Sequence, residues 1–359
     1  MTDVIKIDPE HMEPSLLKWS FHIETIKLWQ KNIPVSPENT PYFSGVVEYK
    51  KKGGGCWAEC LRNGEIDKKA ILVRIRKFKK LWQDISASGY DHNQPIDIAI
   101  TKTGAIVIKD GHHRASIMYM LGLPISAKII ARAPEWDALS RAARRMYGSD
   151  SRKLYHPIDH IEFQDWKIAR DLHHRATAIE LLEANWAGLS VLDIGANQGG
   201  ISFHMADKGA SATAAEQSPV YYNIGENVDK TLRKYQKKTP VTWFRGDGWD
   251  AAKSQRWDWI LCLSVMHHFM KRPDGYEYVK QQLNALLQQA DRGVVVEFGT
   301  KMETQMRNTD IPATQEALGE WLNIMTPGHT WEPIMKGVPK KDQKSGSDYR
   351  WLWATKKQN

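Results

Sequence analysis

The stretch VLDIGANQGG, residues 191–200, decides the fold of the second half of the chain. It opens as an apolar run typical of a buried strand, and it continues into ISFHMADKG (201–209), which predicts a helix. The turn between them holds the glycines Gly195, Gly199 and Gly200. Glycine lets a backbone approach a ligand closely, and the first N–H groups of a helix lack partners within it. The stretch therefore predicts a ligand-binding turn of a kind that several nucleotide-binding folds share.

Two acidic residues stand at the ends of the next predicted strands. Glu216 follows SATAA (211–215), and Asp247 lies between two glycines after VTWFR (241–245). An acid at the end of the second strand can accept hydrogen bonds from both hydroxyls of a ribose. A carboxylate at Asp247 can hold an adenine amino group, and Gly248 lets the backbone approach a ligand.

Strands and helices alternate from about residue 160 onward, which predicts a parallel sheet with crossover helices. WDWILCLSV (257–265) is a fourth strand, and GVVVEFGT (293–300) is a fifth. The end of the fourth strand should lie at the topological switch point, where open α/β sheets bind ligands. His267 and His268 follow that strand, and an imidazole that titrates near neutrality can remove a proton from an oxygen acceptor.

Together these residues resemble the class I S-adenosylmethionine-dependent methyltransferases over roughly 160–357. The resemblance implies a Rossmann-like, seven-stranded sheet that ends in an antiparallel hairpin, which 330–338 and 349–357 fit. S-adenosylmethionine is the implied cofactor, with the backbone of the glycine loop around its methionine part and His268 or His267 as the catalytic base. The implied cofactor residues are Asp193, Gly195, Ala196, Asn197, Gly199, Glu216, Asp247, Gly248 and Ser264.

Two alternatives stay open for the histidines and for Glu297. One histidine could pack on the cofactor while the other is solvated, and Glu297 is either a site residue or the buried partner of a Lys or Arg. Four other histidines, at 156, 160, 173 and 174, have no recognised metal-ligand spacing, so we expect no metal site.

The first half of the chain carries a second candidate site, DGHHR (110–114). Before it, IDIAI (96–100) and AIVIK (105–109) predict a hairpin. After it, ASIMYMLG (115–122) predicts a helix, and ISAKIIAR (125–132) predicts a further strand.

Residues 98–132 resemble the ParB/sulfiredoxin-like superfamily, whose members bind nucleotide phosphates at such a turn. The resemblance implies an N-terminal α+β domain that binds ATP or another nucleotide. This domain would bind phosphate groups or act as a kinase-like domain. Gly111 permits the turn and Arg114 adds a bidentate donor. The implied residues are Asp110, Gly111, His112, His113 and Arg114. The alternative is that DGHHR is a buried structural turn.

Length and composition predict a two-domain, soluble, cytoplasmic protein. The 359 residues are 42% hydrophobic and 26% charged, and no run of 18 apolar residues predicts a membrane span. Three cysteines fit a reducing compartment. We expect a ParB-like domain over 1–134, a linker over 135–159 and a methyltransferase domain over 160–359.

The net charge of +8 is uneven, because residues 1–150 hold 23 Lys and Arg against 17 Asp and Glu. Much of this excess falls in 66–86, which has helical periodicity with Ile71, Ile75, Phe78, Trp82 and Ile85 on one face. A solvated basic face is the simpler interpretation, and an anion-binding or nucleic-acid-binding face is the alternative.

The leading hypothesis is a methyltransferase with a small-molecule, sugar or glycan acceptor. LYHPIDHIEFQDW (154–166) resembles linkers in methyltransferases of surface-polysaccharide and sugar pathways. Met306-Arg307-Asn308 and IPATQEALGEWL (311–322) resemble a tRNA wobble-uridine modifying family that transfers carboxymethyl groups, which makes RNA an alternative partner. A third hypothesis is a ParB-like nucleic-acid-binding protein with a degenerate methyltransferase fold.

Overall fold

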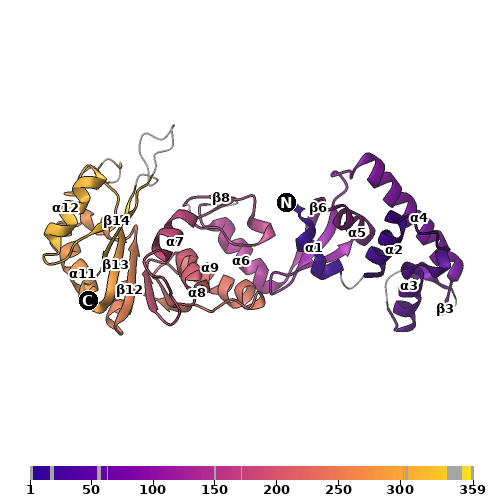
Figure 1. The fold of residues 1–359 in the computed structure, drawn as a ribbon, viewed down its shortest axis with the longest axis horizontal. Coiled ribbons are helices and arrows are strands. Elements are labelled where there is room, and N and C mark those ends of the chain that lie inside the picture. The colour runs from indigo at the N-terminus through magenta and orange to yellow at the C-terminus, as the bar shows by residue number, and fades with distance from the viewer. Residues whose placement is uncertain are drawn as a thin grey trace. The chain divides into compact units, whose positions relative to one another are not determined.

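The computed structural model divides the chain into two compact units, Met1–Asp137 with His160–Glu162, and Ala138–Asp159 with Phe163–Asn359 (Figure 1). It describes residues 3–16, 20–54, 58–62, 64–148, 151–170, 172–301, 303, 306–337 and 350–356. The stretch expected as a linker, 135–159, contains most of helix α6 (Pro134–Arg145), and its residues from 138 onward belong to the second unit.

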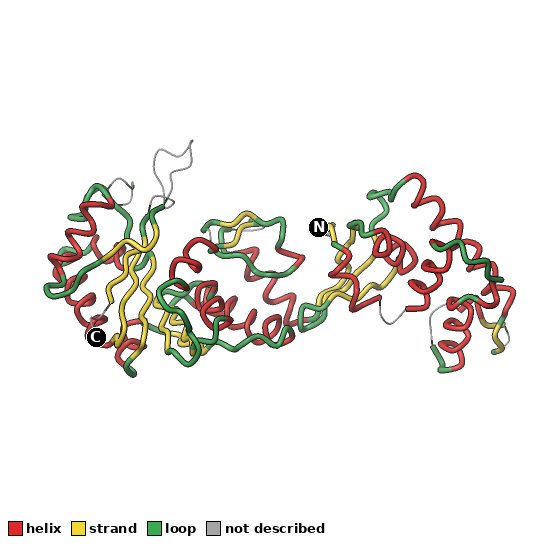
Figure 2. Tube along the Cα trace, in the orientation of Figure 1, coloured by secondary structure: helices red, strands yellow, loops and turns green. Residues whose placement is uncertain are grey.

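The first unit combines a four-stranded sheet with helices (Figure 2). The sheet has the order β1-β6-β4-β5, in which β4 and β6 are parallel and the other pairs are antiparallel. Its strands are β1 (Val4–Ile7), β4 (Ile96–Ile100), β5 (Ile106–Asp110) and β6 (Ile125–Arg132). Its helices are α1 (Pro9–Leu16), α2 (Ser20–Gln30), α3 (Pro41–Lys51), α4 (Lys68–Ser88) and α5 (His112–Leu121). The short elements are η2 (Pro37–Asn39), η3 (Ala58–Cys60), β2 (Leu61–Arg62) and β3 (Glu65–Ile66).

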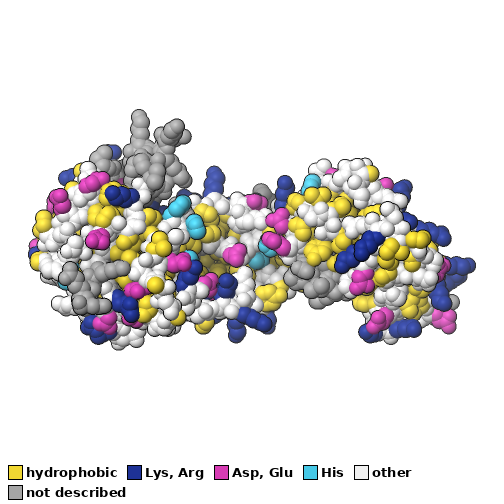
Figure 3. Space-filling view, in the orientation of Figure 1, with side chains coloured by type: hydrophobic (Ala, Val, Ile, Leu, Met, Phe, Trp, Pro, Cys, Tyr) yellow, Lys and Arg dark blue, Asp and Glu magenta, His cyan; other side chains and the backbone are white. Residues whose placement is uncertain are grey.

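Helix α4 confirms the periodicity predicted for 66–86. Asp67 caps its N-terminus by accepting a hydrogen bond from the Ala70 N–H at 3.1 Å, and Gly89 follows its last residue. Of the predicted apolar face only Trp82 is half-buried, while the other four side chains are buried. Figure 3 shows Lys and Arg side chains over this helix. The exposed basic residues of α4 are Lys68, Lys69, Arg76, Lys77, Lys79 and Lys80.

The second unit is built on a seven-stranded sheet in the order β11-β10-β9-β12-β13-β15-β14, counted over the described residues. The first five strands in this order are parallel, and β15 pairs antiparallel with both β13 and β14. The strands are β9 (Ser190–Ile194), β10 (Ser211–Glu216), β11 (Thr242–Arg245), β12 (Trp257–Leu263), β13 (Ala290–Glu297), β14 (Glu332–Met335) and β15 (Leu352–Lys356). The predicted α/β fold and final hairpin are confirmed, although most of the stretch that joins β14 to β15 lies outside the described residues.

Helices lie on both faces of this sheet because its strands are apolar on both sides. Residues next to each other in a strand face opposite layers, so Leu192 and Ile260 pack in one core, whereas Val191 and Leu261 pack in the other. The helices are α7 (His173–Glu180), α8 (Gly200–Asp207), α9 (Pro219–Val228), α10 (Gly248–Lys253), α11 (Gly275–Gln289) and α12 (Gln315–Met325). The remaining short elements are β7 (Lys153–Leu154), η4 (Ile161–Phe163), β8 (Lys167–Ile168), η5 (Asp229–Arg233) and η6 (Met266–Lys271).

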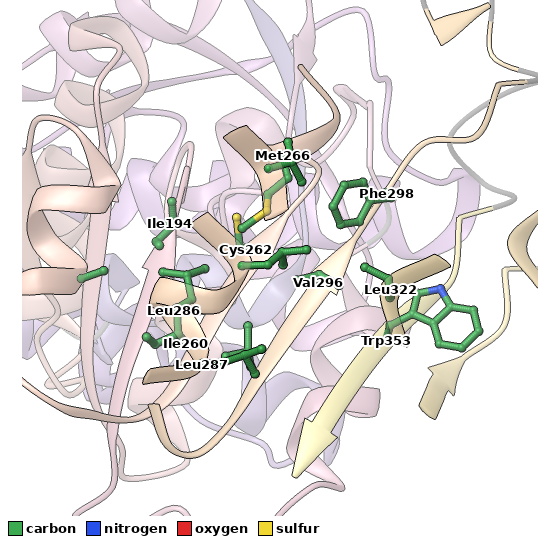
Figure 4. Close-up of a cluster of buried hydrophobic side chains, with 14 of the residues drawn as sticks. Ile194, Ile260, Cys262, Met266, Leu286, Leu287, Val296, Phe298, Leu322 and Trp353 are labelled. Carbon is green, nitrogen blue, oxygen red and sulfur yellow. The ribbon is translucent and has the colours of Figure 1, made fainter. Parts of the chain in front are cut away.

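The first of these cores joins α10, α11 and α12 to the sheet. Figure 4 shows Leu286 and Leu287 of α11 beside Ile260 and Cys262 of β12, with Trp353 of β15 nearer to α12. These side chains are nearly or fully buried, and complete burial of a large apolar side chain contributes about 1.5–3 kcal/mol. The core fixes the strand ends on which the candidate site depends. No helix among the described residues is long and apolar enough to cross a bilayer.

Candidate functional site

The glycine loop leaves β9 at the carboxyl edge of the sheet and enters α8 at Gly200. Gly195 has a φ of +72°, and a Cβ built on it would lie 2.4 Å from Cγ2 of Val265. Only glycine fits this conformation and this space. The N–H groups of Gly195 and Ala196 donate to the Ala215 carbonyl at 2.9 and 3.1 Å, which ties the loop to β10.

Glu216 lies beside the loop, as predicted. Its two carboxylate oxygens accept hydrogen bonds from the backbone N–H of Asn197 at 2.8 Å and of Ser218 at 2.7 Å. Asn197 has a φ of +55°, in the left-handed region that asparagine tolerates better than most residues. An ionised carboxylate has about four lone-pair positions, so Glu216 can still accept two hydroxyl donors.

Asp193 lies beneath the loop rather than on its surface. It is 4% exposed, and one oxygen accepts a hydrogen bond from the Ser202 hydroxyl at 2.7 Å. Burial raises its pKa to about 6, against the lowering effect of Ser202 and with a smaller raising effect of Glu216. Asp193 therefore positions the loop against α8, and any effect on a ligand would be indirect.

Asp247 and Gly248 lie at the end of β11, at the start of α10. Asp247 is exposed and caps α10 by accepting a hydrogen bond from the Trp249 N–H at 3.0 Å. One oxygen makes this cap, and the carboxylate retains capacity for a further donor. Gly199 is the N-cap residue of α8, and its N–H donates to the Ala196 carbonyl at 2.9 Å.

The segment before the second-unit sheet contacts the glycine loop through Gln198. Oε1 of Gln198 accepts hydrogen bonds from the N–H groups of Tyr155 and His156 at 3.0 and 2.9 Å. The His156 ring is buried against Gly200, where an added Cβ would lie 2.6 Å from Nδ1. Burial lowers the pKa of His156 to about 3, so its imidazole is neutral. This bridge could not be predicted, because no spacing pattern in the sequence links Gln198 to Tyr155.

The two predicted catalytic histidines lie in η6, just beyond β12, and differ in environment. Their rings are 4.2 Å apart. His267 is 1% exposed, and burial lowers its pKa to about 2, with help from the charge of Arg350. His268 is exposed at its surface, and partial burial of its ring lowers its pKa, with help from the charges of Lys271 and Arg350. A neutral imidazole with so low a pKa is a weak base, so the geometry favours His268.

A hydrogen-bond network joins the ends of β12 and β13 to β15. Glu297 accepts hydrogen bonds from Arg175 Nη2 at 2.7 Å and from the Ser264 hydroxyl at 2.8 Å. Of the two alternatives predicted for Glu297, the structure therefore shows the buried partner of an arginine. Arg350 donates to the Ser264 hydroxyl at 2.9 Å and to both oxygens of Glu303 at 2.8 and 2.6 Å. The sequence did not indicate this network, because its arginines are far apart along the chain.

In the first unit, DGHHR is not an open turn, because α5 begins at His112 instead of near residue 115. His113 points into the helical layer: Nε2 lies 2.9 Å from the Tyr42 hydroxyl, and the ring stacks on Phe78 with centroids 4.4 Å apart. Burial lowers the pKa of His113 to about 3, and Arg74 lowers it further. The side chain of His113 is therefore a packed, neutral structural group.

The other DGHHR residues surround the N-terminus of α5. Gly111 is the N-cap residue with a φ of +87°, and Asp110 is exposed. Arg114 lies 3.7 Å from Asp110 and donates to the backbone carbonyl of Gln94 at 2.5 Å. Burial lowers the pKa of His112, and Asp110 opposes this effect. The structure brings all five predicted residues together but turns His113 inward.

No protein-family model matches the chain, and no curated protein matches its sequence. Among solved structures, WbdD in a co-crystal with the kinase inhibitor LY294002 is 20% identical, with a TM-score of 0.48 over 60% of this chain and 47% of WbdD. A structure described as the bifunctional kinase-methyltransferase WbdD gives the same score and identity over 60% of this chain and 45% of that one. Magnesium protoporphyrin IX methyltransferase (ChlM) from Synechocystis PCC 6803 with bound SAH is 19% identical, with a TM-score of 0.39 over 52% of this chain and 84% of ChlM. The chain thus spans about half the length of the WbdD structures.

Proposed function

We propose that the second unit is a class I methyltransferase domain that binds S-adenosylmethionine and methylates an oxygen of a small-molecule, sugar or glycan acceptor. The observation that carries this proposal is the placement of Glu216, Asp247 and the glycine loop 195–200 at one edge of a sheet with the order β11-β10-β9-β12-β13-β15-β14. Strands β10 and β12 lie on opposite sides of β9, and open α/β sheets bind ligands where the strand order diverges in this way.

The donors and acceptors at this edge fit the parts of the cofactor. Glu216 retains lone pairs for two ribose hydroxyls, and Asp247 is exposed beside Gly248 for an adenine amino group. Val265 fills the space where a Cβ of Gly195 would lie, so the loop carries no side chain at this position beside the switch point. These features support assignment of the methionine part to the loop.

The cofactor supplies an electrophilic methyl group, and the chain supplies orientation and proton handling. The acceptor oxygen forms a bond to the methyl carbon as the carbon–sulfur bond breaks. Its proton would go to His268, which is exposed at the end of β12, whereas His267 is buried and neutral. We therefore assign the role of base to His268 and not to His267.

For the first unit we propose a ParB/sulfiredoxin-like fold that binds ATP or another nucleotide by its phosphates. The support is the N-terminus of α5, where Gly111 starts the helix in the left-handed region and Arg114 lies in the first turn. His113 is excluded from direct contact in this proposal, since it packs between Tyr42 and Phe78.

An RNA partner is the second candidate function, and the exposed basic residues of α4 are the observation that favours it. In that case the group transferred would be methyl or carboxymethyl. Anisotropy of a labelled tRNA at 50 and 200 mM salt tests this candidate, because binding through several phosphates weakens about 10³-fold or more over that range. Met306 gives it no support, since its side chain is fully buried in the core.

Calorimetry with S-adenosylhomocysteine tests the methyltransferase proposal. We expect saturable binding by the wild type and about tenfold weaker binding by Glu216→Gln, because a charged acceptor of two hydroxyl donors is lost. Asp250→Asn is the matched control, since Asp250 is an exposed acid in α10 and should leave the affinity unchanged. Absence of heat from folded wild-type protein would overturn the proposal.

A further inference from the structure

A cationic cluster lies where β12 and β13 end, and the proposed function leaves it unexplained. It consists of the arginines Arg170, Arg175 and Arg350. Burial lowers the pKa of Arg170, and the charges of Arg350 and Arg175 add to this effect. Two carboxylates, Glu297 and Glu303, lie among them. Counted over the described residues, three guanidinium groups against two carboxylates leave one positive charge in excess in a largely buried setting.

Both carboxylates are already committed to other partners. Glu297 uses one oxygen for Arg175 at 2.7 Å and the other for the Ser264 hydroxyl at 2.8 Å. Glu303 uses both oxygens for Arg350 at 2.8 and 2.6 Å. Among the described residues neither carboxylate has a hydrogen bond or ion pair to Arg170, although Glu297 interacts with it electrostatically, so Arg170 is the least compensated of the three arginines.

Arg170 is held in place by its backbone, while part of its guanidinium lacks a partner. Its N–H donates to the Tyr155 carbonyl at 3.0 Å, next to the Gln198 bridge to the glycine loop. Its Nη1 is shielded from solvent and has no hydrogen-bond acceptor in the part of the chain that the structure describes. Leaving a charged donor buried and unsatisfied is costly, and a bound anion would remove that cost.

A second unsatisfied atom lies in the same neighbourhood. Nδ1 of His267 is buried without a hydrogen-bond partner among the described residues, and the ring interacts electrostatically with Arg350 and Arg170. Because His267 is neutral, one of its nitrogens carries a proton that it can donate. A guanidinium and a neutral imidazole together suit an oxygen anion better than a neutral hydroxyl.

We propose that Arg170 binds an oxyanion, a carboxylate or a phosphate, carried by the methyl acceptor. The inference rests on the proposed function, because methyl transfer places the acceptor at the ends of β12 and β13. The methionine part of the cofactor is assigned to the glycine loop, and binding of the cofactor's own carboxylate by Arg170 is the competing outcome that the test below separates. A phosphorylated or carboxylated sugar therefore fits this site, and an uncharged glycan does not compensate Arg170.

Titration calorimetry of the full chain saturated with S-adenosylhomocysteine tests this inference, with inorganic phosphate and acetate as separate probes. We expect at least one probe to bind the wild type. Its affinity for Arg170→Gln should be about tenfold or more weaker. Arg170→Lys should show an intermediate loss of affinity, because lysine keeps the charge but not the fork of donors. The tighter probe identifies the source of the oxyanion. Arg256→Gln is the matched control, because Arg256 is exposed just before the opposite end of β12 and its loss should leave anion binding unchanged.

Three results would overturn the inference in folded protein, as judged by circular dichroism and melting. The first is that neither probe binds the wild type, and the second is that both probes bind the wild type and Arg170→Gln equally. The third is that Arg170→Gln weakens the binding of S-adenosylhomocysteine instead, which would assign Arg170 to the carboxylate of the cofactor. If the wild type binds no S-adenosylhomocysteine, the proposed function fails, and the same titrations on the unliganded chain still decide whether Arg170 binds anions.

Discussion

At the scale of single residues, the carboxyl group of Asp193 is buried, and burial disfavours its charged form. It is 4% exposed, with one hydrogen bond from the Ser202 hydroxyl at 2.7 Å. Burial raises its pKa from 3.8 to about 6, so the native state binds this proton more tightly than the unfolded chain does. The contribution to stability is therefore present at low pH and is lost as the pH rises through the folded pKa.

Asp193→Asn should remove this pH dependence. A shift from 3.8 to about 6 corresponds to about 3 kcal/mol, so the wild type should lose roughly that much stability, relative to the variant, between about pH 4 and pH 7. Asparagine keeps an acceptor for Ser202 and cannot ionise. Urea unfolding of both proteins from pH 4 to 7 measures the difference. Parallel pH profiles would show that Asp193 is ionised at no unusual cost in the native state.

Site residues that lie at the end of a strand could be predicted from the sequence, whereas residues that only the tertiary fold brings together could not. Asp193 and Glu216 could be predicted, because each lies at or near the end of an apolar run beside glycine or a helix start. Arg170 and Arg350 interact electrostatically although they come from distant parts of the chain, and no periodicity joins them. A hydrogen-bond network of this kind has no local signature.

At the scale of elements, the residue at which helix α5 begins decides how the DGHHR side chains are placed. The sequence placed the helix from residue 115, which would leave DGHHR as an open turn. The helix begins at His112, since Gly111 takes the left-handed conformation that ends β5 and starts the first turn. Starting the helix there directs His113 toward Tyr42 and Phe78.

Alanine substitutions at the two ends of α5 should differ in cost. Gly111 and Gly122 both have left-handed φ values, +87° and +68°, so alanine costs about 1 kcal/mol of strain at each. A Cβ at Gly111 would also lie 2.4 Å from Cγ2 of Ile96, whereas at Gly122 it meets nothing within 4 Å. We expect Gly111→Ala to lower the free energy of unfolding by at least 1 kcal/mol more than Gly122→Ala in urea titrations. Equal losses would mean that Ile96 moves aside without cost.

Elements with strong local patterns were predictable, and those that depend on distant pairing were not. The strands β9 and β12 and the hairpin β4–β5 follow from apolar runs bounded by glycine or turn residues. Strand β1 has only four residues, and its partner β6 lies more than 100 residues later in the chain. The pairing of Val4 with Lys128 therefore leaves no trace in the local sequence.

At the scale of the whole molecule, the candidate sites fall into separate compact units. The α5 site belongs to the first unit, and the glycine loop with the cationic cluster belongs to the second. Each unit has its own sheet, and the two buried clusters that cover the larger sheet both lie within the second unit. A ligand of the second unit should therefore act on the stability of that unit alone.

Differential scanning calorimetry of the full chain tests this independence. We expect two unfolding transitions, and S-adenosylhomocysteine at 100 times its Kd should stabilise the second unit by about 2.7 kcal/mol, which moves one transition up by about 5–10 °C. Gly111→Ala should lower the other transition and leave the ligand-induced shift unchanged, because Gly111 lies in the first unit. Glu216→Gln should reduce the shift and leave the first-unit transition in place. A single transition that shifts with the ligand and with both substitutions would contradict this prediction. It would mean that the two units unfold together, so that a ligand of one unit stabilises both.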